Sequence, residues 1–150
     1  MTLARFVASG FGAGYVPVAP GTFGSLVGLV LGGLLLHAWP TGVPLTALAA
    51  ILLGLWSIGK VGGGDDPGWI TIDEVAGQLL ALTPLATPTP LGLLAAFALF
   101  RLLDITKPGP IGWADRQHGP AGVMGDDVIA GLIAAGILWA VQQKYPMIFA

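Results

Sequence analysis

Charged residues divide the chain into long apolar stretches and two polar loops. No charged residue lies between Arg5 and Lys60, and Pro40-Thr41-Gly42 splits this interval into two apolar runs. Each run has about the length needed to cross a bilayer. The pattern as a whole predicts five helical segments, at residues 23–39, 43–59, 73–84, 91–103 and 128–141.

These runs are long and rich in leucine, alanine and glycine, whereas strands show short alternating patterns. We therefore predict an all-α fold, a small polytopic membrane helical bundle of about five helices, with residues 1–150 forming a single domain. Polar loops are expected at residues 60–71 and 104–127. The apolar part of the third segment is short, so we expect this helix to be half-inserted or tilted.

Composition restricts the class of protein further. Hydrophobic residues make up 55% of the 150 residues and charged residues only 9%, far below the roughly 25% of an ordinary soluble domain. Such a composition excludes both a soluble fold and intrinsic disorder. Six basic against eight acidic residues give a net charge of −2, so no nucleic-acid partner is expected. The absence of cysteine excludes disulfides and thiolate chemistry.

The five segments, if they alternate across the membrane, bring both polar loops to the side of the N-terminus. Every Asp and Glu then lies on one membrane face together with five of the six basic residues, and Lys144 alone lies opposite. The positive-inside rule makes the charged face cytoplasmic. So many carboxylates at one surface indicate an acidic site at one membrane face.

Two groups of carboxylates are candidates for binding a hard cation: Asp66 in the first loop with Asp73 and Glu74 at the start of the third segment, and Asp126 and Asp127 at the end of the second loop. Capping is the alternative interpretation, because Thr71 and Glu74 match a capping box and paired acids suit a helix start. Capping accounts for one acid at each place but not for the groups. Oxygen ligands of this kind suit Mg²⁺.

Positive and hydroxyl groups suggest where an anion would bind. Arg101, Asp104 and Lys107 are spaced by three and share a helix face, which indicates either an interfacial ion pair or cations that hold a phosphate. Residues 17–25 form a turn that leads into a helix. There Thr22 is either the N-cap or, with Ser25, part of an anion cradle at the positive helix end.

Glycines repeat every four residues in the first segment, at Gly24, Gly28 and Gly32. They place a smooth strip on one helix face and permit close helix contact. The partner helix lies either in the same chain or in another copy, which would make a homo-oligomer.

Four stretches together resemble the phosphatidylglycerophosphatase A family: Pro17…Pro20-Gly21-Thr22…Gly24-Ser25, Asp66-Pro67…Ile70…Asp73-Glu74…Gly77, Arg101…Asp104…Lys107-Pro108…Pro110-Ile111…Asp115, and Asp126-Asp127…Ala130-Gly131. They occur in family order and cover roughly residues 12–136. Thr71 stands where the family usually has an aliphatic residue.

The resemblance implies an all-helical enzyme of the bacterial inner (cytoplasmic) membrane, with its site facing the cytoplasm. Its expected substrate is phosphatidylglycerophosphate, whose terminal phosphate is hydrolysed with Mg²⁺ to give phosphatidylglycerol and phosphate in phospholipid biosynthesis. The haloacid-dehalogenase and PAP2 phosphatase motifs are absent from this sequence.

The residues and the resemblance together lead to one hypothesis for the site. The Mg²⁺ ligands are expected to be carboxylates: Asp66, Asp73, Glu74, Asp126 and Asp127. The expected phosphate ligands are Thr22, Ser25, Arg101 and Lys107, and Asp104 either orients Arg101 or joins the metal ligands. Catalysis is assigned to Asp73, Glu74, Asp104, Lys107 and Asp127, with attack by water preferred over an aspartyl-phosphate intermediate.

Three other classes of function stay open at this stage. Intramembrane carboxylates are typical of a small ion-coupled membrane transporter, but here the acids lie at segment ends and no inverted halves are visible. A second alternative is another lipid phosphotransferase, although the CDP-alcohol phosphatidyltransferase motif is absent. A structural subunit would leave the acidic face without a role.

Overall fold

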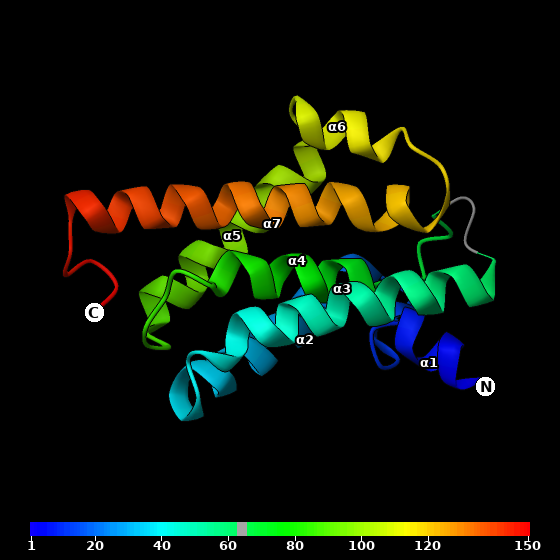
Figure 1. Ribbon diagram of the computed structural model, residues 1–150, viewed down its shortest axis with the longest axis horizontal. Coiled ribbons are helices and arrows are strands. Elements are labelled where there is room, and N and C mark those ends of the chain that lie inside the picture. Colours follow the sequence, from blue (N-terminus) through cyan, green and yellow to red (C-terminus); the bar gives the residue numbers. More distant parts are fainter. Residues whose placement is uncertain (63–65) are drawn as a thin grey trace.

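The computed structural model describes residues 1–62 and 66–150. The described residues form helices and no strand: α1 (Leu3–Ala8), the 3₁₀ helix η1 (Ala13–Tyr15), α2 (Pro20–Ala38), α3 (Gly42–Val61), α4 (Ile72–Leu82), α5 (Pro90–Thr106), α6 (Pro110–Asp115) and α7 (Gly119–Lys144). The predicted all-α class is therefore confirmed. Figure 1 shows the long helices arranged side by side along the longest axis.

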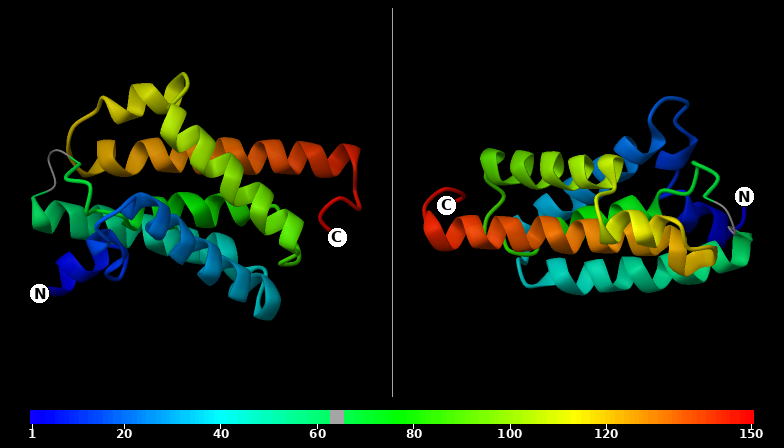
Figure 2. Two further views of the ribbon diagram at one scale, coloured as in Figure 1. Left: turned by 180° about the vertical axis from the view of Figure 1, so that it is seen from behind. Right: turned by 90° about the horizontal axis from the view of Figure 1, so that it is seen from above.

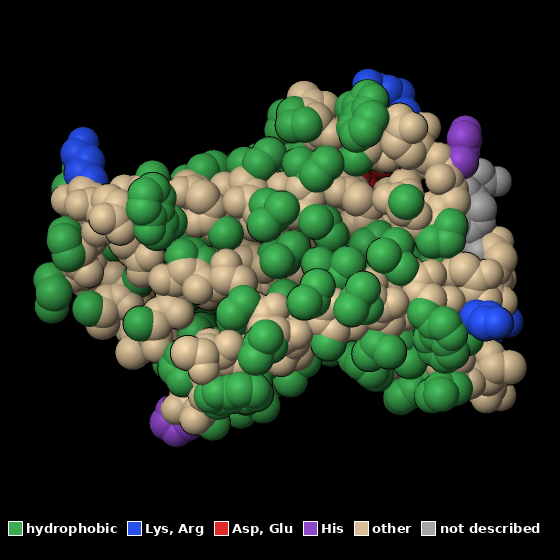
Figure 3. All heavy atoms as spheres, in the orientation of Figure 1, with side chains coloured by type: hydrophobic (Ala, Val, Ile, Leu, Met, Phe, Trp, Pro, Cys, Tyr) green, Lys and Arg blue, Asp and Glu red, His purple; other side chains and the backbone are tan. Residues whose placement is uncertain are grey.

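Three helices, α2, α3 and α7, are long and apolar enough to cross a membrane. Their outer faces expose large hydrophobic side chains such as Leu48, Leu52 and Leu132. Hydrophobic side chains are spread over the whole face seen in Figure 3, and the visible lysines and arginines lie toward its ends and upper edge. A surface of this kind is stable in lipid but not in water, so the protein is membrane-associated.

Helix α4 is the central element of the bundle. It has 11 residues, nine of them buried, and it packs against α2, α3, α5 and α7. A helix of this length extends about 16 Å, roughly half the hydrocarbon core of a bilayer. The prediction of a short third helix is confirmed, and its half-inserted or tilted placement in the membrane stays a prediction.

Glycines allow α4 to approach its neighbours. A Cβ built on Gly28 would lie 2.8 Å from the backbone oxygen of Val75, and one on Gly131 would lie 2.4 Å from that of Gly77. Only glycine permits helix backbones to come so close. The strip on α2 therefore packs against α4 of the same chain, so it is no longer an argument for a homo-oligomer.

The helix ends and connections gather at two opposite ends of the bundle, along its longest axis. Figures 1 and 2 show the N-terminus, the α3–α4 connection and the start of α7 toward one end. The α2–α3 turn and the C-terminus lie toward the other end. Both α2 and α4 start on the side of the N-terminus, so residues of the predicted loops and of these helix starts meet there.

Several predicted boundaries are wrong, and proline explains most of them. The expected loop 104–127 contains α6 and the first turns of α7, which start with Pro110 and with Gly119-Pro120. Proline ends a preceding helix, but it also suits a first helical turn, where its missing N–H costs nothing. Helix α1 was not predicted at all, and α3 continues into the expected loop as far as Val61.

Candidate active site

Five buried or half-buried carboxylates from three helices converge beneath α6. The first turn of α4 supplies Asp73 and Glu74, the last turn of α5 supplies Asp104, and α7 supplies Asp126 and Asp127. They form two groups that share Asp127, and within each group one oxygen per residue lies within 4.8 Å of the others. We call Asp73, Glu74 and Asp127 the open triad, and Asp104, Asp126 and Asp127 the paired triad.

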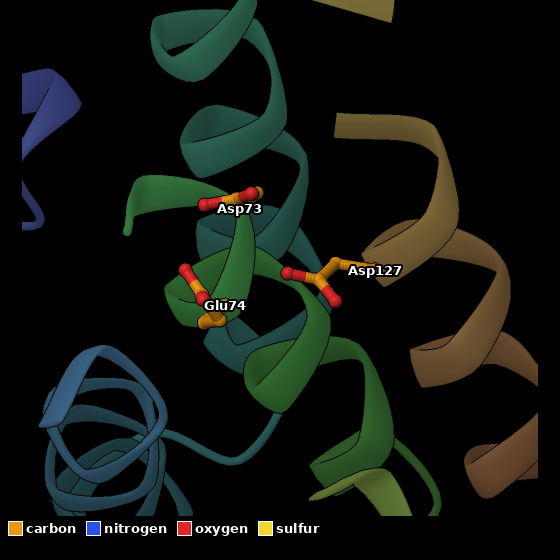
Figure 4. Close-up of side chains that lie close together, drawn as sticks. All are labelled: Asp73, Glu74 and Asp127. Carbon is orange, nitrogen blue, oxygen red and sulfur yellow. The ribbon is translucent and has the colours of Figure 1, made fainter. Parts of the chain in front are cut away.

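The packing of α4 on α7 creates the open triad. A Cβ on Gly77 would lie 2.7 Å from the backbone oxygen of Asp127, so the two helices are closest one turn after Asp73. Figure 4 shows Asp127 extending from α7 toward α4, where Asp73 and Glu74 project from the first turn. Carboxylates far apart in sequence thus share one site.

The open triad has acceptors without donors. Asp73 and Asp127 are only 4% and 2% exposed. One oxygen on each member, Oδ1 of Asp73, Oε2 of Glu74 and Oδ1 of Asp127, is buried without a hydrogen-bond partner. Within residues 1–62 and 66–150, no lysine or arginine forms an ion pair with the three. Buried acceptors of this kind need a proton or a cation.

The pKa values of the two α4 carboxyls reflect the same lack of hydrogen-bond donors and positive charges. Burial raises the pKa of Asp73 well above its ordinary value, and the charges of Glu74 and Asp127 raise it further. Burial also raises the pKa of Glu74, to about 7. Without a cation the open triad therefore retains protons near neutral pH.

The paired triad, in contrast, has its own cations. Arg101 forms an ion pair with Asp104, and its Nη2 lies 3.4 Å from Oγ1 of Thr22 on α2. Lys107 pairs with Asp126, and its Nζ lies 2.9 Å from Asp115 and 3.8 Å from Asp104. Two positive groups thus lie beside the acidic cluster.

Lys107 remains charged in this setting. Burial opposes its charge, but hydrogen bonds to Asp126 and Asp115 outweigh that effect and raise the pKa of Lys107. Its backbone is left-handed, with φ of 47°, and it ends α5. Helix α5 thus continues three residues past the predicted segment 91–103, and the side chain of Lys107 reaches Asp115 of α6 and Asp126 of α7.

Comparison with known proteins identifies the family. The family model described as phosphatidylglycerophosphatase A matches residues 6–142. The Escherichia coli protein of that name is 37% identical over 147 residues, which cover 95% of this chain and 86% of the relative. The Haemophilus influenzae protein of the same name is 40% identical over 144 residues, covering 92% and 88%. The chain belongs to the phosphatidylglycerophosphatase A family.

A third relative, from Bacteroides thetaiotaomicron, is 36% identical over 137 residues and covers 84% of this chain and 85% of its own. Its given name, a provisional one, is phosphatidylinositol-3-phosphatase. No solved structure matches the chain. The phosphatidylglycerophosphatase A family consists of phosphatases, so the predicted class of enzyme is confirmed.

Most of the residues expected in a phosphatidylglycerophosphatase A site come together, but two do not. Asp66 is exposed, belongs to neither triad, and accepts a hydrogen bond from the amide of Gly68 at 3.1 Å. The hydroxyl of Ser25 is buried and donates to the carbonyl of Gly21 at 2.9 Å. Their roles in metal and phosphate binding remain predictions.

The capping alternatives are wrong for α2 and α7, whereas at α4 the expected N-cap residue and two first-turn acids are in place. Thr22 lies inside α2, whose N-cap is Ala19. Thr71 is the N-cap of α4, but its side chain makes no capping hydrogen bond. Asp126 and Asp127 lie two turns inside α7 and cap nothing. Capping therefore does not account for the two α7 carboxylates of this phosphatidylglycerophosphatase A family member.

Three polar features were missed at the sequence level. Asp115 pairs with Lys107, and the fully buried Gln78 has no partner for either end of its amide. A polar cavity of about 490 Å³ lies beside the site, with walls that include Asp66, Asp115, Arg116 and Asp126. A glutamine within an apolar helix, four residues after Glu74, was a signal that could have been used.

Proposed function

We propose that this protein hydrolyses the terminal phosphate of phosphatidylglycerophosphate to give phosphatidylglycerol and phosphate, in phospholipid biosynthesis. Family membership supplies the substrate, because two relatives are named for it. The observation that carries the chemistry is the juxtaposition of the open triad, with its unpartnered oxygens, and Arg101 and Lys107. A phosphomonoester needs both a cation site and fixed positive charges.

The residues of the open triad fit Mg²⁺. Asp73, Glu74 and Asp127 each offer a buried carboxylate oxygen without a partner, and hard cations prefer such ligands. Asp126 lies next to Asp127 but is paired with Lys107, so we place it around the ion rather than first among its ligands. When bound, Mg²⁺ offsets phosphoryl charge and lowers the pKa of water.

Arg101 and Lys107 bind the phosphate in this proposal. The planar guanidinium of Arg101 suits two phosphoryl oxygens at once, and Asp104 and Thr22 hold it in place. Lys107 keeps its proton because its pKa is raised, so it acts as a fixed positive charge. The dianionic substrate would compete with Asp104 and Asp126 for these cations.

In the reaction we favour, the oxygen of a water molecule attacks phosphorus and the ester P–O bond breaks. The leaving glycerol oxygen takes a proton, and phosphate is released. The polar cavity beside Asp126 gives phosphate a route toward water, while the lipid product stays in the bilayer. An aspartyl-phosphate intermediate is the alternative, and the two are separated by hydrolysis of a substrate with a chiral, isotopically labelled phosphoryl group, because one displacement inverts the configuration at phosphorus and two displacements retain it; retention would contradict direct attack.

The charged end of the bundle belongs, in this proposal, at the cytoplasmic face of a bacterial inner membrane. Three of the six basic residues, Arg5, Lys60 and Arg116, lie in α1, near the end of α3 and in the connection that leads into α7, all toward that end, whereas Lys144 ends α7 at the other. Accessibility of single cysteines introduced at Lys60 and Lys144 to an impermeant reagent in intact cells would test this orientation.

Phosphate release by the purified protein in detergent tests the activity. We expect release from phosphatidylglycerophosphate that requires Mg²⁺ and stops in EDTA. Phosphatidylinositol 3-phosphate is the competing substrate to include, because the Bacteroides relative carries that name. Faster hydrolysis of that lipid would contradict phosphatidylglycerophosphate as the preferred substrate. Full activity in EDTA would contradict the proposed dependence on Mg²⁺.

A further inference from the structure

A row of polar side chains on α4 faces the glycine strip of α2. A Cβ on Gly24 would lie 2.8 Å from Cβ of Thr71 and 3.3 Å from Cβ of Glu74. A Cβ on Gly28 would lie 2.9 Å from Cβ of Gln78. Thr71, Glu74 and Gln78 therefore leave α4 on one face, and Gln78 is the deepest of the three in the bundle.

Gln78 is fully buried, and neither Nε2 nor Oε1 of its amide has a hydrogen-bond partner. Oε2 of Glu74 is also buried without one. An unpaired buried polar group is costly, and such a group in a native protein calls for an explanation. The two residues offer a donor and an acceptor on the same helix face.

The helix brings these two groups within reach of each other. Gln78 follows Glu74 by four residues, and residues at this spacing are neighbours on a helix surface. Side chains in a helix lean toward its N-terminus, so the amide of Gln78 leans toward Glu74. The pairing we infer below requires a change of side-chain rotamer.

We propose that Gln78 is a positioning residue, which donates a hydrogen bond from Nε2 to the carboxylate of Glu74 when a divalent cation occupies the open triad. This inference rests on the proposed function, because it takes Glu74 as a cation ligand. Ligating carboxylates are commonly held by a second hydrogen bond, and loss of that bond typically lowers metal affinity 10–100-fold. Gln78 is the buried donor in the right position.

A merely structural Gln78 gives a different expectation. Replacing an unpaired buried amide with an apolar group of the same shape is neutral or stabilising. Gln78→Met keeps the length of the side chain and removes the amide. If Gln78 only fills space between α2 and α4, this variant binds Mg²⁺ as the wild type does.

The test measures Mg²⁺ binding as the rise in Tm of the full-length protein in detergent, titrated with MgCl₂, alongside phosphate release at each concentration. For Gln78→Met we expect an unchanged or higher Tm without Mg²⁺ and a half-saturating Mg²⁺ concentration raised about tenfold. Leu79→Met is the matched control, because Leu79 is equally buried on α4 but carries no amide. It should bind Mg²⁺ like the wild type.

Gln78→Asn provides a second variant in case Gln78→Met does not fold. It keeps the amide on a side chain that is one methylene shorter, so the amide no longer reaches Glu74. We therefore expect the same weakening of Mg²⁺ binding. Half-saturation within twofold of the wild type in either folded variant overturns the positioning role. A wild-type protein whose Tm and activity both ignore Mg²⁺ overturns the proposed cation instead, so the two failures are distinguishable.

Discussion

The two triads share Asp127 but differ in how their charge is balanced. In the paired triad, Arg101 and Lys107 supply positive charge from the chain itself. In the open triad, three carboxylates meet with no such partner among the described residues. This difference is the basis of the division of labour that we propose, in which the open triad takes a cation from solution and the paired triad holds Arg101 and Lys107 for the phosphate.

Removing the shared residue should have the largest effect. Asp127→Asn keeps the shape of the side chain but removes a charge from both triads. We expect phosphate release to fall about 10²–10³-fold, the usual cost of losing one electrostatic group at an active site. Circular dichroism and Tm in detergent should show a folded protein. Activity near that of the wild type would place the chemistry elsewhere.

Changing one member of each triad should separate their roles. Glu74→Gln is expected to raise the half-saturating Mg²⁺ concentration 10-fold or more, with a smaller change in KM for lipid. Arg101→Lys keeps the charge but loses the two-pronged guanidinium, so KM for lipid should rise about tenfold while Mg²⁺ half-saturation stays the same. If both variants changed the same parameter, the division of labour would be wrong.

The pH dependence of stability should differ with and without Mg²⁺. The pKa of Glu74 is raised from 4.5 to about 7, so the metal-free protein is favoured below pH 4.5 and loses that stability as pH rises through 7. We expect Tm in EDTA to fall between pH 5 and 8. Mg²⁺ should restore more Tm at pH 8 than at pH 5, because at low pH it must displace protons.

Asp66 should give the smallest effect. It is exposed and lies outside both triads, and most surface substitutions change free energies by no more than about 0.5 kcal/mol, roughly twofold in a binding constant. We expect Asp66→Asn to leave Mg²⁺ half-saturation within that factor. A tenfold change would support the sequence-level assignment of Asp66 to the metal.

Local patterns in the sequence were sufficient for several features. The long apolar runs predicted the helices, and the short third apolar run predicted that α4 is short, because length and hydropathy are properties of a contiguous stretch. The spacing of Arg101, Asp104 and Lys107 predicted a shared face, and Arg101 does pair with Asp104. The expected loop 104–127 was wrong because Pro110 and Pro120 lie in the first turns of α6 and α7 instead of in a loop.

The sequence by itself determined that this protein is an all-helical membrane protein with its carboxylates at segment ends, because the bilayer imposes segment length and excludes scattered charge. Only the tertiary structure decided which carboxylates meet. Glycine contacts fix how closely α4 approaches α2 and α7, and that approach joins Asp127 to Asp73 and Glu74 while leaving Asp66 outside. Such distances depend on packing between segments far apart in the chain, which no local pattern encodes.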